Sequence, residues 1–67
     1  MSGCTVNRRD HDLEVGETVA RLLERLGIGG PYALVERNGE PVERARYAET
    51  VLAPGDRIIV ARPVAGG

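Results

Sequence analysis

One short amphipathic helix is the clearest structural pattern in this sequence. Four apolar residues recur at the spacing i, i+3, i+4 and i+7 and so share one helix face: Val19, Leu22, Leu23 and Leu26. Thr18 is suited to cap the first turn, and Gly27 stands where a left-handed residue commonly ends a helix. A helix of about two and a half turns is not stable alone in water. Its apolar face must therefore pack on a sheet.

The polar face of this helix is expected to carry Arg21, Glu24 and Arg25. Glu17 stands four residues before Arg21, a spacing at which opposite charges pair on a helix. The sequence therefore predicts a Glu17–Arg21 ion pair on the wet side.

The N-terminal part of the chain predicts a hairpin. Residues 4–8 form a candidate first strand, and residues 8–10 a polar turn. Residues 11–15 alternate polar and apolar side chains, which predicts a half-buried strand with Leu13 and Val15 facing inward.

A second hairpin follows the helix. Residues 32–37 predict a strand, and Asn38-Gly39 is the strongest two-residue hairpin turn because both residues accept positive φ. The return strand, residues 40–42, belongs at a sheet edge because Pro41 cannot donate a hydrogen bond. Residues 43–49 predict an irregular or 3₁₀ turn with Tyr47 facing inward.

Residues 57–62 form the last expected strand, and a turn over residues 53–56 precedes it. Val51 and Leu52, before this turn, are expected to add to the hydrophobic core. The β-branched composition of the last strand favours a central position. With one helix available, the expected α+β fold has a mixed sheet of four to five strands covered on one face. If Ile58 and Val60 point to the helix, Ile59 and Ala61 point away.

The open face is a candidate partner surface, because an apolar group there lies next to the chain's end. The candidate interface residues are Leu34, Arg57, Ile59, Ala61 and Arg62.

Composition limits what this chain can do. Sixty-seven residues predict one small domain, residues 1–67, without room for a deep cleft, so the chain is not expected to be an enzyme. A net charge of −1 and only two aromatic residues give no basis for binding nucleic acid, and no apolar run approaches membrane-spanning length. A lone His11 does not make a metal site. The single Cys4 favours a reducing, cytoplasmic setting, where a monomer is expected.

The sequence ends on Gly66-Gly67, after a spacer of three residues. Glycine lacks a Cβ, so such an end is thin and unhindered. Residues 63–67 are expected to form a flexible tail that reaches about 16 Å if extended. The α-carboxylate of Gly67, with a pKa of about 3.5, is an anion at neutral pH and can attack a nucleotide phosphate.

With these elements in order, the chain resembles the β-grasp, or ubiquitin-like, proteins, and among them the ThiS-type sulfur carriers of thiamin biosynthesis. The resemblance runs from about Val6 to Gly67. Its residues are Val6-Asn7, Gly16-Glu17-Thr18-Val19, Leu22-Leu23, Glu36-Arg37-Asn38-Gly39, Arg44, Tyr47, Gly55-Asp56 and Gly66-Gly67. The chain departs from the family at Arg8, where glycine is frequent, and at Tyr47, where tryptophan is frequent.

The resemblance implies a chemistry for the tail. An adenylating enzyme of the ubiquitin-activating type uses ATP to activate the carboxylate of Gly67, with Gly66, Ala65 and Val64 recognised beside it. A persulfide, usually from a cysteine desulfurase, then displaces AMP to leave a thiocarboxylate. Thiazole synthase takes up the sulfur. The chain itself binds no cofactor and supplies no catalytic residue in this scheme.

Other readings stay open at the level of sequence. The small subunit of molybdopterin synthase shares this fold and tail, although those relatives are usually longer. A ubiquitin-like modifier would end in an isopeptide bond to a target lysine; this chain has no lysine of its own. A plain β-grasp interaction domain with an incidental Gly-Gly end is the remaining alternative.

Overall fold

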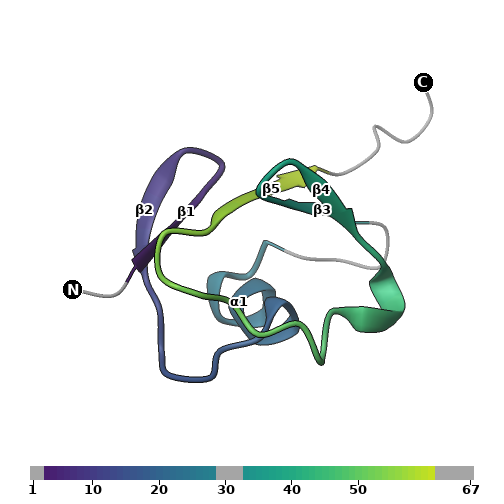
Figure 1. The fold of residues 1–67 in the computed structure, drawn as a ribbon, viewed down its shortest axis with the longest axis horizontal. Helices are drawn as coiled ribbons and strands as arrows, with labels where there is room; N and C mark the ends of the chain where they lie inside the picture. The colour runs from purple at the N-terminus through teal and green to yellow at the C-terminus, as the bar shows by residue number, and fades with distance from the viewer. Residues whose placement is uncertain (1–2, 29–32, 62–67) are drawn as a thin grey trace.

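The structure is a computed structural model that describes residues 3–28 and 33–61. Two hairpins, one helix and one last strand follow each other along the chain (Figure 1). The elements are β1 (Gly3–Val6), β2 (Arg9–Asp12), α1 (Val19–Leu26), β3 (Leu34–Arg37), β4 (Glu40–Val42), the 3₁₀ turn η1 (Arg44–Arg46) and β5 (Arg57–Ala61).

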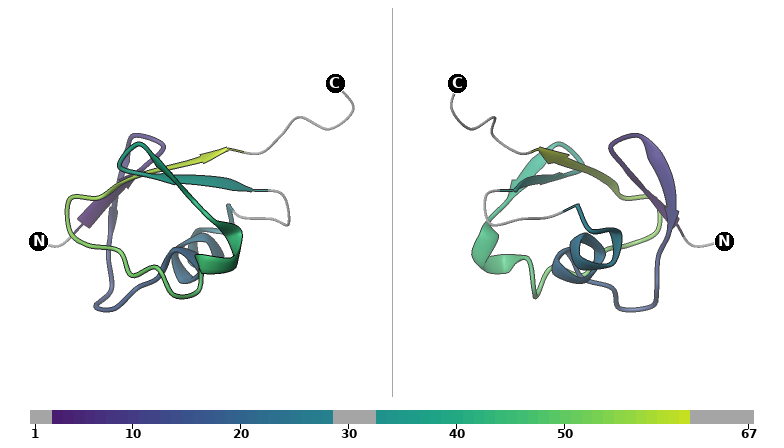
Figure 2. Two further views of the ribbon diagram at one scale, coloured as in Figure 1. Left: turned by 45° about the vertical axis from the view of Figure 1, so that its right-hand side comes forward. Right: turned by 180° about the vertical axis from the view of Figure 1, so that it is seen from behind.

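The five strands form one mixed sheet in the order β2-β1-β5-β3-β4. β1 and β5 run parallel, and the other neighbours are antiparallel. β5 is therefore the central strand, which confirms the position predicted from its β-branched residues. The helix lies on one side of this sheet in all views (Figure 2). The α+β class with one helix on one face is confirmed.

The helix forms as its sequence predicts. The Thr18 hydroxyl accepts a hydrogen bond from the Arg21 N–H at 3.2 Å, and Gly27 ends the helix with φ of 66°. Val19, Leu22 and Leu23 are buried, and Leu26 packs at the rim of the core.

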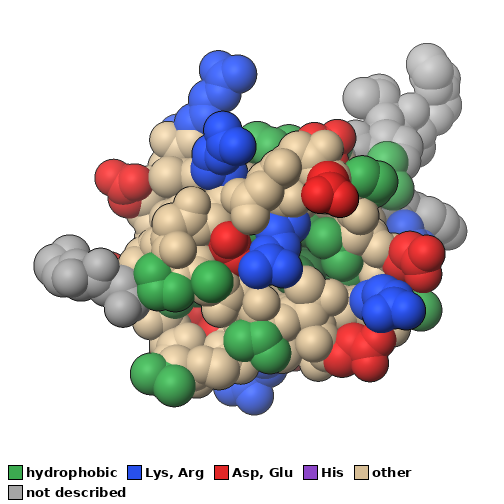
Figure 3. Space-filling view, viewed as in Figure 1, with side chains coloured by type: hydrophobic (Ala, Val, Ile, Leu, Met, Phe, Trp, Pro, Cys, Tyr) green, Lys and Arg blue, Asp and Glu red, His purple; other side chains and the backbone are tan. Residues whose placement is uncertain are grey.

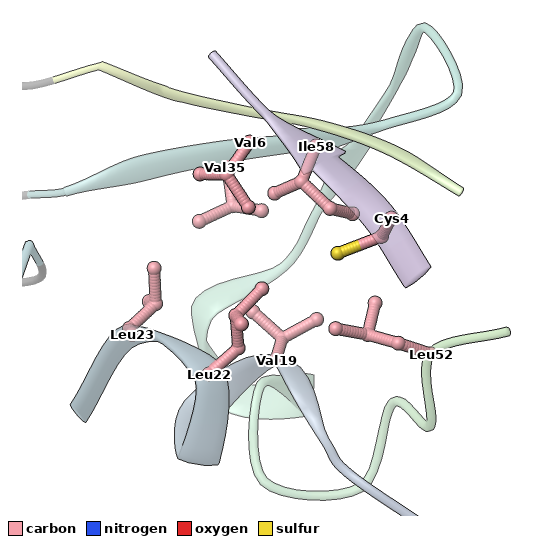
Figure 4. Packing of buried hydrophobic residues seen from close by; sticks show 8 residues of the cluster. All are labelled: Cys4, Val6, Val19, Leu22, Leu23, Val35, Leu52 and Ile58. Atoms are coloured by element: carbon pink, nitrogen blue, oxygen red, sulfur yellow. The ribbon is translucent and has the colours of Figure 1, made fainter. Parts of the chain in front are cut away.

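Side chains from the helix and from three strands meet in one core between helix and sheet (Figure 4). Its buried members are Cys4, Val6, Val19, Leu22, Leu23, Val35, Leu52 and Ile58. Tyr47 packs against this cluster, and its hydroxyl donates to the Ala33 carbonyl at 3.0 Å. The predicted inward orientation of Tyr47 after a 3₁₀ turn is thus confirmed.

The N-terminal hairpin differs from its prediction. A two-residue turn at Asn7-Arg8 replaces the turn expected over residues 8–10, so β2 begins at Arg9 and ends at Asp12. Gly3 opposite Asp12 is the last pair of β1 and β2. Val15, expected inside, lies three residues after the end of β2 and is fully exposed. Leu13 still packs partly against the core.

Val51 was expected to add to the core and is instead exposed. The segment around it runs beside the start of α1. There the Val19 N–H donates to the backbone carbonyl of Thr50, and the Leu52 N–H donates to the backbone carbonyl of Glu17. Side chains alternate along such an extended segment, so Leu52 turns inward and Val51 turns to solvent.

Candidate functional site

The predicted reactive end of the chain lies outside the described residues. Arg62, Val64, Ala65, Gly66 and Gly67 lie outside the described residues, as does the tail over residues 63–67. What the structure describes is the strand that leads to them, which ends at Ala61.

The other candidate interface residues lie together on the uncovered face of the sheet. Ile58 is buried against the helix, and Val60 packs partly against the core, whereas Ile59 is 40% exposed. Leu34, 58% exposed, stands directly opposite Ala61 across β3 and β5. These three residues, Leu34, Ile59 and Ala61, form what we call the apolar strip.

Charged and rigid groups border the apolar strip. Glu36 lies opposite Ile59 on one side and opposite Pro41 on the other. Arg57, two residues before Ile59, lies on the same face beside Thr5 of β1. In the view of Figure 3, apolar side chains reach the surface in separate patches with acidic and basic side chains between them.

Glu17 and Asp56 are buried carboxylates whose burial was not predicted from the sequence. Each accepts hydrogen bonds that connect a loop to a neighbouring helix or strand. The Glu17 side chain is only 2% exposed, and Arg25 donates to it through Nε at 2.8 Å and Nη2 at 2.9 Å. The hydrogen bonds from Arg25 lower the pKa of Glu17 and outweigh the opposing effect of burial. The predicted Glu17–Arg21 pair is therefore wrong, because Glu17 precedes the helix and turns toward its later turn.

Asp56 holds the turn before β5 to the second hairpin. It accepts hydrogen bonds from the Ala53 N–H at 2.8 Å, from Asn38 Nδ2 at 3.0 Å and from Arg37 Nε at 2.8 Å. Burial opposes the charged form, but these hydrogen bonds together lower the pKa of Asp56. Its ionised carboxylate fixes the start of β5.

Asn7 and Asn38 make side-chain contacts with β5 that were not predicted from the sequence. Asn7 and Asn38 each open a two-residue hairpin turn with φ near 50°, and each also binds the backbone of β5 through its side chain. The hairpin turn at Asn38 was predicted from sequence, but the second function requires knowing which strand lies beside the turn.

Cys4 is an unpaired, buried thiol in the core. Burial raises the pKa of this thiol, and the nearby carboxylates of Glu17 and Asp56 add to the effect. A raised pKa keeps the group protonated and unreactive, which agrees with a structural role.

The described residues also form hollows at the surface. A hollow of about 470 Å³ beside the second hairpin is lined largely by polar and charged side chains, among them Arg37, Glu40, Glu43 and Arg46. Residues 3–28 and 33–61 contain no group of three His, Cys, Asp or Glu side chains placed to hold a metal ion. In the same residues, no helix has the length and apolar character needed to cross a membrane.

The fold and this open face define a β-grasp protein: a five-stranded mixed sheet, one helix beneath it, and a central last strand whose outer side chains are exposed. The model of the ThiS family matches residues 4–67. The chain therefore belongs to the ThiS family.

A solved structure supports this membership. The crystal structure of the thiamine biosynthesis protein ThiS from Geobacter metallireducens is similar to this chain with a TM-score of 0.79 and 31% identity. The similarity covers 97% of this chain and 99% of that one.

Two curated relatives carry the name thiazole synthase. The protein from Magnetococcus marinus is 37% identical over 62 residues, and that from Paramagnetospirillum magneticum is 31% identical over 62 residues. Each match covers 92% of this chain but only 19% of the relative. The chain thus spans about a fifth of the length of these relatives.

Proposed function

We propose that this chain is a sulfur carrier for thiazole synthesis, with the carboxylate of Gly67 as its reactive group. The observation that carries the proposal is the match to the ThiS family, which extends through Gly66 to Gly67. The similarity to a thiamine biosynthesis protein over nearly the whole of both chains supports it.

The chemistry follows from the weakness of a carboxylate as an acyl donor. One oxygen of the Gly67 carboxylate attacks the α-phosphorus of ATP and expels pyrophosphate, so that AMP becomes the leaving group. The terminal sulfur of a persulfide then attacks the acyl carbon and displaces AMP, and a thiol cleaves the resulting S–S bond to release the thiocarboxylate. Glycine leaves the acyl carbon open to a bulky sulfur nucleophile.

In this scheme the catalytic groups belong to the partners. An adenylating enzyme of the ubiquitin-activating type binds ATP, a cysteine desulfurase or another persulfide donor supplies sulfur, and this chain serves as their co-substrate. We place the reaction in the cytoplasm, where the unpaired Cys4 is in keeping with reducing conditions.

Thiazole synthase is the acceptor that the relatives favour. Two longer proteins of that name each contain a segment similar to this chain. A carrier segment joined to a synthase would present its sulfur at high effective concentration, and a separate carrier must instead dock. This favours the thiamin pathway over molybdopterin synthesis and over protein modification.

The apolar strip is the docking surface that we propose for these partners. Ile59 and Ala61 lie in the second half of β5, from which the chain continues toward Gly67, and Leu34 of β3 stands opposite Ala61. Arg57 and Glu36 beside it offer one charge of each sign for orientation. Docking here would bring a partner next to Ala61, the residue at which β5 ends.

Removal of Gly67 tests the proposal. With the adenylating enzyme and ATP, the intact chain is expected to be adenylated, while a Gly67 deletion and Gly66→Leu are expected to lose activation and keep the wild-type unfolding midpoint. Activation of the Gly67 deletion at the wild-type rate would refute the mechanism.

A further inference from the structure

The central strand β5 loses its neighbour on one side before it ends. β1 pairs with β5 only as far as Val6 opposite Ile58, because the chain then turns at Asn7-Arg8. Val60 lies two residues further along β5, with the backbone groups that face β1 left without a strand partner. The end of β5 leads directly to the C-terminal residues.

Asn7 takes the place of the missing strand. Its N–H donates to the Ile58 carbonyl at 2.9 Å, which extends the β1–β5 pairing by one bond. Its Oδ1 accepts from the Val60 N–H at 2.8 Å, and its Nδ2 donates to the Val60 carbonyl at 3.3 Å. One side-chain amide thereby satisfies both backbone groups of Val60, as a strand residue would.

Asn38 makes a related contact at the opposite end of the same strand. Its N–H donates to the Arg57 carbonyl at 2.7 Å, and its Oδ1 accepts from the Arg57 N–H at 2.8 Å. Two hairpin turns on opposite sides of β5 thus hold its first and its penultimate residue. Only the Asn7 contact lies at the end that continues toward Gly67.

Few residue types could replace Asn7. The turn requires a residue that accepts a φ of 50°, which asparagine, aspartate and glycine do most readily. The contact with Val60 requires both an acceptor and a donor on a short side chain, and of these three residue types only asparagine provides both. Aspartate keeps the shorter, accepting bond, and glycine keeps the turn alone.

We propose that Asn7 is a positioning residue for the activation of Gly67. This inference rests on the proposed function. Asn7 fixes Val60, the penultimate residue of β5, relative to the apolar strip, so that a partner docked there finds the end of the strand at a constant point. Because Gly67 must reach one point in the partner's active site, a constant starting point at the end of β5 raises the fraction of docked complexes in which it does so, which acts on the chemical step more than on docking.

Matched glycine variants separate this role from plain stability. Asn7→Gly and Asn38→Gly each keep a turn-compatible residue. The first deletes the side-chain contact with Val60, and the second deletes the contact with Arg57 together with the hydrogen bond to Asp56. We expect Asn7→Gly to lower the kcat of adenylation about tenfold with little change in KM for the carrier, since docking is untouched. Asn38→Gly is expected to stay within twofold of the wild-type kcat. Both are measured by pyrophosphate release with the organism's own ThiS-adenylating enzyme, well below the unfolding temperature.

Amide exchange and a conservative variant complete the test. Asn7→Gly is expected to speed hydrogen exchange at Val60, Asn38→Gly at Arg57, and Asn7→Asp to recover part of the lost kcat through the accepting bond. Equal kcat values for the two glycine variants would overturn the proposal. A wild-type chain that is never adenylated would reject the proposed function and this use of Asn7 with it, whereas the Val60 exchange rate would still show whether the contact forms.

Discussion

At the scale of single residues, two buried carboxylates account for much of the order in the connecting segments. Glu17 ties the segment before α1 to Arg25, and Asp56 ties the turn before β5 to Arg37 and Asn38. Both pKa values are lowered, so folding favours the ionised forms.

These shifts predict a loss of stability in acid. A carboxylate whose pKa is lower in the folded state stabilises the fold above its ordinary pKa, and that contribution disappears as the pH falls through the folded value. The ordinary value for Glu17 is 4.5 and for Asp56 3.8, so the free energy of unfolding is expected to fall as the pH drops below about 4.5. Urea unfolding at pH 7, 5 and 3 measures this.

Glu17→Gln is the matched variant for that experiment. It is expected to cost about 2 kcal/mol at pH 7, because Arg25 loses its charged acceptor, and to show a smaller further loss in acid. A wild-type free energy of unfolding that stays constant from pH 7 to pH 3 would contradict this account.

Sequence reasoning recognised Glu17 but gave it the wrong partner. The i, i+4 rule applies to residues on one helix, and Glu17 lies before the cap at Thr18. Its partner Arg25 is eight residues away and is reached only once the preceding segment has folded onto the helix. No local spacing carries that information.

At the scale of elements, the central position of β5 and the second hairpin were easier to predict than the boundaries of the short first hairpin. The β-branched composition of β5 correctly placed it at the centre, and Asn38-Gly39 correctly placed the second hairpin. β2 was misplaced because its residues are mostly polar and its position is set by the Asn7-Arg8 turn. Apolar alternation at Leu13 and Val15 was therefore misleading.

The first hairpin contains a strained position that can be relieved. Arg8 has a φ of 72°, a region that costs a residue with a Cβ roughly 1 kcal/mol relative to glycine. Arg8→Gly is expected to raise the free energy of unfolding by about 0.5–1 kcal/mol in thermal or urea unfolding.

Gly39 provides the opposite control in the second hairpin. It has a φ of 85° with open space where a Cβ would stand, so Gly39→Ala is expected to destabilise by about 1 kcal/mol through backbone strain alone. If Arg8→Gly destabilised the protein, the proposed strain at the first turn would be wrong.

At the scale of the whole molecule, the helix leaves one face of the sheet uncovered (Figure 2). The apolar strip lies on that face next to the end of β5. The alternation of Ile58 and Ile59 was predictable from period two alone. That Leu34 stands opposite Ala61 was not, because it depends on the register between β3 and β5.

Introducing a charged side chain into the apolar strip tests whether the strip is a docking surface. Ile59→Asp and Leu34→Asp are expected to raise the KM of the adenylating enzyme for the carrier at least tenfold, because a buried unpaired charge at an interface is costly. Val15→Asp is the control, since Val15 is fully exposed on the connection before the helix and away from the open face. Equal KM values for all three variants would place the docking surface elsewhere.

The intact mass of the protein purified from sulfur-replete cells tests the central claim most directly. The account predicts a population in which one oxygen of the terminal residue, Gly67, is replaced by sulfur, and which disappears when the adenylating enzyme is deleted. A chain that keeps an unmodified carboxylate while the adenylating enzyme, ATP and a persulfide donor are all present would contradict it.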